Sequence, residues 1–397
     1  MWMMLSAYLL SVGWPLAPQN TTHAVGYNYG QFLEIYDVKM HNGIDVLGAA
    51  GDPVYAVADG YVKAWLTTSG QQHYLLAIGD EFGTDSCDGW IYQHLDPNMY
   101  HLNLGDTCST GELIGHIVSF ANDFHHVHFS RIRSAGYPWT TCRFIQNPLT
   151  MVSPNTDTIL PVFENATGSE LFAFCGDNSS EYLDPVCLTG NIDIIARVYD
   201  RTGDFASVPI WDHLVPNRLE YRIYGPDTVP TTLAVDFSGF LNDSIQYALT
   251  IYKNDSVCNS ECDYWTRDFY FIVTNTDGDS LIELSDSAGC WQTAAYQDGV
   301  YWVVVTAYDA YGNMASDSMQ VVVQNNPGVE EGPSVRNVAE YCHMGTTIFS
   351  GALSLPRGVK CRVYDIAGRV VEVEKIAPGV YFVEIENEIV QKVIKIR

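Results

Sequence analysis

Hydrophobic and polar positions alternate in short runs along most of the chain. In residues 24–150, such runs are found at residues 54–58, 61–66, 74–78, 89–94, 111–116 and 126–130. Short apolar runs bounded by Gly- and Asp-containing turns are typical of β-strands. The dipeptide Asp59-Gly60 between the first two runs predicts a hairpin turn. This region is therefore expected to form a compact antiparallel sheet domain.

Residues 155–325 show the same kind of pattern, and no helical period of useful length occurs there. Predicted strands lie at residues 192–200, 219–224, 300–309 and 319–323. The last two flank Gly312-Asn313, which predicts a closing hairpin. This ending resembles immunoglobulin-like modules of bacterial surface proteins, so the resemblance implies a β-sandwich middle domain.

The composition changes again near the C-terminus. Residues 326–335 are rich in Pro, Gly, Asn and Glu and are expected to be a linker. Nine of the twenty Lys and Arg residues lie from Arg336 onward, among short predicted strands and tight turns. Residues 336–397 resemble the C-terminal sorting domain of type IX secretion. This resemblance implies that the type IX secretion machinery is a partner of the protein. A plain second β-sandwich is the alternative. The expected fold class is all-β, with a small C-terminal β-sandwich as its third domain.

The net charge and the N-terminal sequence restrict the expected partners and the expected location of the protein. The chain has 397 residues, is 47% hydrophobic and carries a formal net charge of −27, which disfavours nucleic acid as a partner. Residues 1–19 form an apolar run with small residues near Ala17 and are expected to be a signal peptide, although no Lys or Arg precedes Lys39. An ordinary buried strand or helix is the alternative. No later run is long enough for a transmembrane segment, so we expect a secreted or cell-surface protein exported through the periplasm.

Ten cysteines are compatible with export. Three pairs are close in sequence: Cys175 and Cys187, Cys258 and Cys262, Cys342 and Cys361. Export would allow disulfides at these positions, but the connectivity cannot be deduced from the sequence. No Cys-x-x-Cys motif occurs, which disfavours a structural zinc site made of four cysteines.

Histidine is distributed unevenly, with nine of the eleven residues in the first 150 positions. His41 and Asp45 form a His-x-x-x-Asp motif, and His126 and His128 form a His-x-His motif. Residues two apart on a strand share a face, so His126 and His128 are expected to point the same way. Each motif alone is weak, but together they supply the imidazole and carboxylate ligands of a catalytic zinc site.

The residues around these motifs resemble the lysostaphin/LytM-type zinc endopeptidases, which hydrolyse peptidoglycan. The matching segments, in order, are residues 41–46, 51–62, 92–95, 105–106, 111–115, 126–129 and 147–149. We therefore assign residues 24–152 to a zinc metallopeptidase domain. Residues 118–125 depart from the family's Gly- and Thr-rich turn and place bulk at the rim of the expected groove. Cys108 replaces a small aliphatic residue and is expected to be a buried thiol or half of a disulfide.

The resemblance implies specific roles. His41, Asp45 and His128 would bind one zinc ion per chain, and His94 and His126 would be catalytic histidines. The expected substrate is peptidoglycan, cleaved at peptide bonds of its stem or cross-bridge. Two alternatives stay open: a non-catalytic wall-binding or adhesive surface protein on a peptidase fold, and a metallopeptidase of Gly-rich proteins. His125 is expected to be a solvated neighbour.

Overall fold

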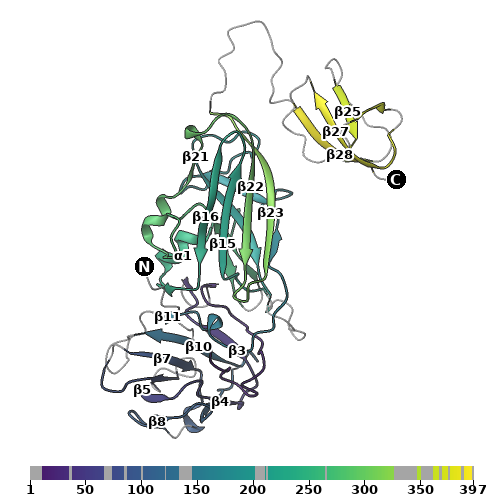
Figure 1. The fold of residues 1–397 in the computed structure, drawn as a ribbon. Helices are drawn as coiled ribbons and strands as arrows, with labels where there is room; N and C mark the ends of the chain where they lie inside the picture. Colours follow the sequence, from purple (N-terminus) through teal and green to yellow (C-terminus); the bar gives the residue numbers. More distant parts are fainter. Residues whose placement is uncertain are drawn as a thin grey trace, which may run out of the picture. The chain divides into compact units, whose positions relative to one another are not determined.

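The computed structural model shows an all-β protein with one short α-helix (Figure 1). It describes residues 11–34, 38–66, 74–84, 87–99, 102–120, 122–133, 145–201, 211, 213–263, 266–325, 347–349, 361–365, 369–373, 376–385 and 389–395. The chain divides into two compact units, residues 1–327 and residues 328–397.

An eight-stranded sheet is the main element of residues 24–150. Its strands are β3 (Ile44–Leu47), β5 (Gly60–Leu66), β6 (Leu75–Gly79), β7 (Asp88–Gln93), β8 (Thr107–Cys108), β10 (His126–Arg133), β11 (Ile145–Gln146) and β17 (Phe240–Leu241). The order is β17-β11-β10-β7-β6-β5-β8, and β3 pairs with the first half of β10. Val127 and Phe129 of β10 are fully buried in the core. His126 and His128, which alternate with them along the strand, therefore face the other side of the sheet.

Two small pairs complete this part: β1 (Phe32–Leu33) with β2 (Lys39–Met40), and β4 (Pro53–Tyr55) with β9 (Leu113–His116). A third pair, β18 (Glu261–Cys262) with β19 (Arg267–Asp268), belongs to residues 155–325. The predicted hairpin at Asp59-Gly60 is wrong, because β4 pairs with β9 while β5 joins the large sheet. The Asp59 carboxylate instead accepts hydrogen bonds from the backbone N–H and hydroxyl of Thr110, at 2.6 and 2.7 Å.

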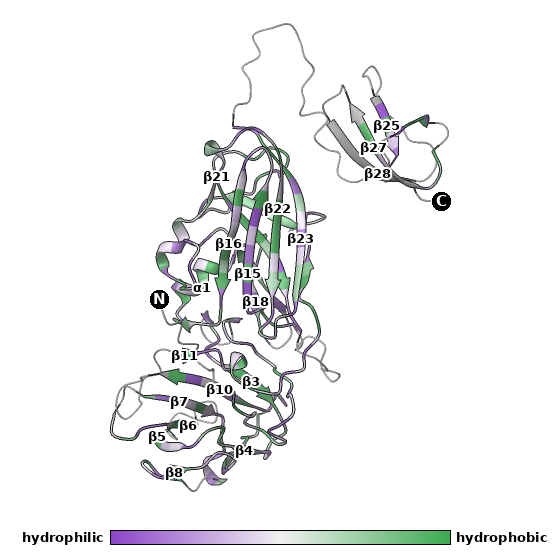
Figure 2. Ribbon diagram, in the orientation of Figure 1, coloured by the Kyte–Doolittle hydropathy of each residue, from purple (hydrophilic) through white to green (hydrophobic). Residues whose placement is uncertain are grey.

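Residues 155–325 form two further sheets. One contains β12 (Val162–Glu164), β13 (Phe172–Gly176), β14 (Asn191–Tyr199), β20 (Tyr270–Ile272) and β21 (Trp291–Gln292), and the other has the order β16 (Thr228–Asp236), β15 (Arg218–Tyr224), β22 (Gly299–Tyr308), β23 (Met314–Val323). Figure 2 shows hydrophobic segments along β22. Side chains of both sheets belong to one buried cluster, including Ile194 of β14 and Val305 of β22. The predicted hairpin around Gly312-Asn313 is confirmed by the pairing of β22 with β23.

The same buried cluster also includes core residues of the first sheet, such as Trp14 and Phe129. In addition, β17 comes from residues 155–325 but extends the first sheet through β11. Packing therefore crosses the expected domain boundary at residues 152–155.

Part of the expected signal peptide also belongs to this packing. Trp14 is fully buried, its indole N–H donates to the Pro154 carbonyl at 2.8 Å, and Val12 forms a bridge with Val152. The cleavage near Ala17 stays a prediction. A leader that leaves this packing intact would have to end before Val12.

One helix, α1 (Ile245–Ile251), lies in the region expected to lack helices. It has only seven residues, too few for a hydrophobic period to be visible in the sequence. It buries Ala248 and Ile251. In the described part of the chain, no helix is long and apolar enough to cross a membrane.

The second unit contains five described strands in one sheet. They are β24 (Thr347–Phe349), β25 (Cys361–Asp365), β26 (Val370–Val371), β27 (Gly379–Ile385) and β28 (Ile389–Lys395). β24 runs parallel to β28, and the other pairs are antiparallel. The whole of the expected linker and most of residues 336–360 lie outside the described residues.

Four of the cysteines considered for disulfides, Cys175, Cys187, Cys258 and Cys262, have free thiols in the structure. Cys108 is buried and also free, and its burial raises the pKa of the thiol to about 12. It is therefore an inert thiol rather than a disulfide partner. Cys342 lies outside the described residues.

Candidate metal centre

The pairing of β3 with β10 creates the site. In this antiparallel register Asp45 lies opposite His128, and His126 lies two residues earlier on the same face of β10. His41 lies one turn before β3, where its backbone N–H donates to the Gln31 carbonyl at 2.8 Å. Segments more than 80 positions apart in sequence thus contribute side chains to one point.

Three of these side chains are close enough to share a cation. The potential ligand atoms of His41, Asp45 and His128 all lie within 4.8 Å of one another, and all three residues are buried. Nδ1 of His128 is 3.0 Å from Oδ1 of Asp45 and 2.9 Å from Nε2 of His41. Nε2 of His41 is 3.2 Å from the same carboxylate oxygen. This group could hold a metal ion.

The far sides of both imidazole rings have their own partners. Nδ1 of His41 is 3.0 Å from the Asn28 carbonyl, which can only accept a hydrogen bond. The Ser130 hydroxyl donates to the Asn42 carbonyl at 2.8 Å, so its oxygen is available to accept from Nε2 of His128 at 3.2 Å. These contacts favour the tautomers that leave Nε2 of His41 and Nδ1 of His128 with free lone pairs. Such outer partners orient metal-binding histidines in general.

His94 and His126 lie beside this group. Their ring centroids are 4.6 Å apart in an edge-to-face arrangement, and the His94 ring is 6.1 Å from that of His128. Nε2 of His126 is 3.2 Å from Oδ2 of Asp45, and its Nδ1 is 2.8 Å from the Phe124 carbonyl. His94 adopts a positive φ of 68°, which is uncommon for a residue with a side chain and often occurs at functional sites.

The departure noted in residues 118–125 also lies against the site. The Phe120 ring stacks on His126 at 5.0 Å and meets His94 edge-to-face at 5.1 Å. His125 points elsewhere, with Nδ1 accepting from the Phe120 backbone N–H at 3.1 Å. The expected bulk at the rim is therefore an aromatic wall next to both predicted catalytic histidines.

Burial and charge set the protonation of these groups. Burial alone would raise the pKa of Asp45, but the charges of His126 and His41 and the hydrogen bonds from the imidazoles hold it well below its usual value. Burial lowers the pKa of His128 to about 4 and lowers that of His126 against the opposing charge of Asp45. Burial and the charge of His126 lower the pKa of His94 well below normal. Neutral imidazoles and an ionised carboxylate are the forms that bind metals.

Residues of the middle region support the site, and sequence reasoning missed all of them. The Asn28 side chain, whose backbone carbonyl faces His41, donates to the Val215 carbonyl at 2.9 Å. Asn42 donates to the Asp243 carboxylate at 3.0 Å. The Trp211 ring packs edge-to-face on Phe124, which in turn contacts His126. These partners lie far away in sequence, and no motif marked them.

Arg267 adds a further connection. This buried residue donates to the carbonyls of Gly26 and Trp211 at 2.6 and 3.0 Å, and its guanidinium lies 4.2 Å from the centre of the Tyr27 ring. Tyr27 lies against His41, with ring centroids 5.8 Å apart. The middle region therefore holds the segment that orients His41.

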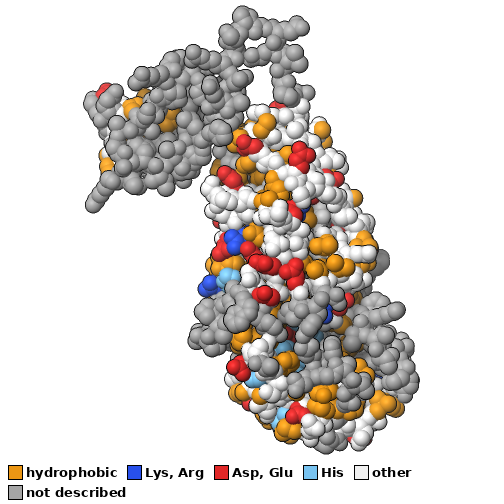
Figure 3. Space-filling model, turned by 180° about the vertical axis from the view of Figure 1, so that it is seen from behind, with side chains coloured by type: hydrophobic (Ala, Val, Ile, Leu, Met, Phe, Trp, Pro, Cys, Tyr) orange, Lys and Arg blue, Asp and Glu red, His pale blue; other side chains and the backbone are white. Residues whose placement is uncertain are grey.

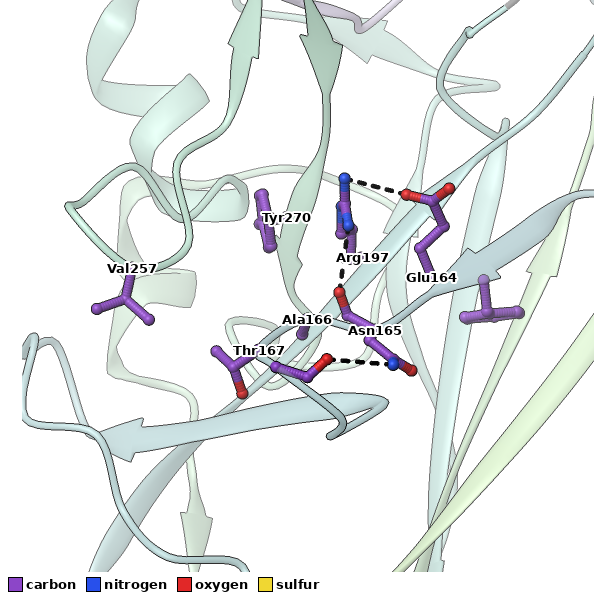
Figure 4. A pocket seen from close by; sticks show the side chains of 9 residues that line it. Glu164, Asn165, Ala166, Thr167, Arg197, Val257 and Tyr270 are labelled. Carbon is purple, nitrogen blue, oxygen red and sulfur yellow. Dashed lines mark hydrogen bonds and ion pairs between the residues drawn. The ribbon is translucent and has the colours of Figure 1, made fainter.

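A pocket lies elsewhere, on the middle region (Figure 4). Its basic residue Arg197 already forms ion pairs with Glu164 at 3.0 Å and Asp268 at 2.7 Å and lies over the Tyr270 ring. None of the five predicted site residues lines this pocket. The chemistry therefore points to the histidine cluster and not to this pocket.

The sequence of the region that contains the cluster matches a known family. Residues 39–139 match the model of Peptidase family M23. The chain carries a peptidase M23 domain. All five predicted site residues lie within the matched segment. Among curated proteins, none matches the chain.

Several solved structures are similar to the M23 domain and its surroundings. The catalytic domain of the antimicrobial peptidase lysostaphin from Staphylococcus simulans is 26% identical, with 32% of this chain and 90% of that chain covered and a TM-score of 0.26. A catalytic-domain variant of the prophage-encoded M23 protein EnpA from Enterococcus faecalis is 22% identical, with 32% and 91% covered and a TM-score of 0.25. Csd3 from Helicobacter pylori is 19% identical, with 36% and 35% covered and a TM-score of 0.26.

Gly43 provides a test of the site's geometry. A Cβ at this position would lie 2.4 Å from Oγ of Ser130 and 2.6 Å from Nε2 of His128, closer than such atoms approach. We expect Gly43→Ala to displace the His128 ring and to weaken metal binding by roughly 10–100-fold, as loss of outer partners does. Zinc titration monitored by calorimetry measures the effect.

Gly83→Ala is the matched control, because a Cβ there would meet no atom within 4 Å. The control should bind zinc like the parent protein. Equal zinc affinity in Gly43→Ala and the parent would contradict the assignment of His128 as a ligand held by Ser130.

Proposed function

We propose that this protein is a secreted zinc-dependent endopeptidase that hydrolyses peptide bonds in the stem or cross-bridge of peptidoglycan. One observation carries the proposal: within the M23 domain, Nε2 of His41, the Asp45 carboxylate and Nδ1 of His128 converge beside two further imidazoles.

The donor set fits zinc. Two neutral imidazoles and one carboxylate are typical of catalytic zinc sites, in which a fourth position stays open. His41, Asp45 and His128 would hold the ion, and their outer partners Asn28 and Ser130 already favour the required tautomers. When bound, zinc supplies Lewis acidity that activates water and polarises a carbonyl group.

His94 and His126 would handle the proton. Their lowered pKa values keep both rings neutral near pH 7, so each can accept a proton or donate an N–H to developing negative charge. Nδ1 of His94 is buried with no hydrogen-bond partner among the described residues. Nδ1 of His126 faces the Phe124 carbonyl, which orients the ring toward Asp45.

The substrate class follows from the family. M23 peptidases imply a peptidoglycan substrate. The edge-to-face and stacked contacts of Phe120 with the two histidines narrow one side of the site. A slender peptide backbone, such as that of a short stem or cross-bridge, is the substrate that this wall admits best.

The C-terminal unit is proposed to target the protein for secretion. Residues 328–397 form their own compact unit and contain nine of the twenty Lys and Arg residues. A separate, relatively basic β-unit supports the hypothesis of a type IX sorting domain that directs the chain through the periplasm to the cell surface.

A wall-digestion assay tests the activity. Purified peptidoglycan should lose turbidity with the zinc-loaded protein and release new amino termini. Removal of zinc by a chelator should abolish both signals, and added zinc should restore them. Binding to walls without release of amino termini would instead favour the non-catalytic wall-binding alternative.

Substitution of the two flanking histidines separates catalysis from metal binding. His94→Ala and His126→Ala should each reduce kcat by roughly 10²–10⁴-fold, the usual contribution of a general acid or base. Both variants should still bind one zinc per chain, because neither residue belongs to the group of converging ligands. His125→Ala is the control, since its ring points away from the cluster. Parent-like kcat in either variant would remove that histidine from the mechanism.

Truncation tests the role of the second unit. A chain ending at Val329 retains the whole of the first compact unit and its buried clusters, so zinc binding and kcat should stay within about twofold of the parent. In a host with type IX secretion, the truncated chain should remain in the periplasm. Cell fractionation with immunoblotting measures this, and normal export of the truncated chain would refute the sorting role.

A further inference from the structure

A second group of converging acidic side chains lies far from the M23 site. Asp157 lies in the segment that joins the first sheet to the middle region, Asp200 follows β14, and Asp309 follows β22. One carboxylate oxygen from each lies within 4.8 Å of the other two. No part of the proposed peptidase chemistry uses these residues.

Their burial makes this arrangement costly without a compensating charge. Asp200 is 1% exposed and Asp309 is 4% exposed. Burial raises the pKa of Asp200 well above normal, and the charges of Asp309 and Asp157 raise it further. Burial also raises the pKa of Asp157. Buried carboxylates normally have a cationic partner or a metal. The neighbouring Arg201 has its guanidinium over the Tyr199 ring and donates to the Tyr199 hydroxyl at 3.4 Å.

Several polar atoms at this point have no partner among the described residues. Oδ1 of Asp200, Oδ2 of Asp157 and the hydroxyl of Tyr311 are all buried and make no hydrogen bond. The pKa of Tyr311 is raised by burial and then by the charges of all three aspartates, which indicates that its hydroxyl is near them. Buried polar groups are nearly always satisfied, so these oxygen atoms are candidate ligands for a cation.

The remaining contacts fix the carboxylates in place. Oδ1 of Asp309 accepts from the backbone N–H groups of Tyr311 and Asn313, both at 2.8 Å. The Asn313 side chain donates to Oδ2 of Asp309 at 2.6 Å and to the Asp157 carbonyl at 3.1 Å. The Asp200 backbone exchanges two hydrogen bonds with Leu214, at 2.7 and 2.9 Å. The acidic group is therefore held by its surroundings before any ligand binds.

We propose that Asp157, Asp200 and Asp309 form a calcium site that ties the joining segment to the ends of β14 and β22. Three carboxylates offer hard oxygen ligands and no nitrogen or sulfur, which suits calcium better than zinc. The net charge of −27 also favours binding of a cation. On the face drawn in Figure 3, red acidic side chains outnumber blue basic ones. Bound calcium would fasten the segment from which the middle region begins.

The test uses the full-length protein, freed of metal and reloaded with one equivalent of zinc. Calcium chloride is then titrated by calorimetry and by thermal unfolding. We expect one calcium per chain, with a dissociation constant of about 10⁻⁴–10⁻³ M as in extracellular calcium modules, and a melting temperature that rises with calcium concentration. Magnesium at equal concentration should give a smaller rise, because it demands a tighter octahedral geometry.

Asp200→Asn should abolish calcium binding and the calcium-dependent rise. Asp193→Asn is the matched control: Asp193 is buried in β14, the strand that precedes Asp200, and also has an unpartnered oxygen among the described residues, but it lies outside the acidic group. The control should respond to calcium like the parent. If Asp200→Asn does not fold, Asp157→Asn, at a partly exposed position, serves for the same readout.

Two results would overturn the proposal. The first is a folded parent protein whose melting temperature is unaffected by calcium, which would mean that the carboxyl groups share protons instead. The second is an equal calcium response in the parent, Asp200→Asn and Asp193→Asn, which would place the binding elsewhere. Zinc content measured in the same samples shows that the M23 site is unchanged.

Discussion

The antiparallel pairing of β3 with β10 is the constraint on which the M23 site depends. It places the Asp45 carboxylate opposite His128 and turns His126 to the same face. Asp45 is only 4% exposed, yet the pKa of its carboxyl group is held low by the surrounding imidazoles. A shift of one residue in this register would move both histidines to the opposite face, into the packing now occupied by Val127 and Phe129. Core packing therefore specifies the position of the predicted metal ligands.

The middle region acts as a support for this geometry rather than as a distant appendage. It shares one buried cluster with the first sheet and adds β17 to that sheet's edge. Its Val215 carbonyl and Arg267 guanidinium hold the segment that carries Asn28 and Tyr27. Since Asn28 faces His41, forces on the middle region reach the predicted ligand through two hydrogen bonds. The shared cluster and the added strand make the described fold continuous across residues 152–155.

Local patterns predicted much of the fold, and the resemblance to the lysostaphin-type family pointed to His41, Asp45 and His128, whose side chains lie together in the structure. Alternation and turns gave the strands at β6, β7, β10, β15 and β22, because each depends on neighbouring residues. The error at Asp59-Gly60 arose from partner choice: β4 pairs with β9, about 60 positions later, and no local signal reports that preference. The contacts of Asn28, Trp211 and Arg267 were missed for the same reason. Helix α1 was too short to show a period.

Asp45 and Asp200, two buried aspartates of the first unit, show how neighbouring side chains determine which cation a carboxylate can bind. At Asp45 the carboxylate has imidazole nitrogens around it, and their charges and hydrogen bonds lower its pKa. At Asp200 the interacting side chains are carboxylates, and they raise the pKa further. Mixed nitrogen and oxygen ligands suit zinc and a reaction in which water is activated, whereas oxygen ligands alone suit a hard cation with a structural role. The different neighbours of two buried aspartates thus distinguish the proposed zinc site from the proposed calcium site, which would stabilise the region supporting it.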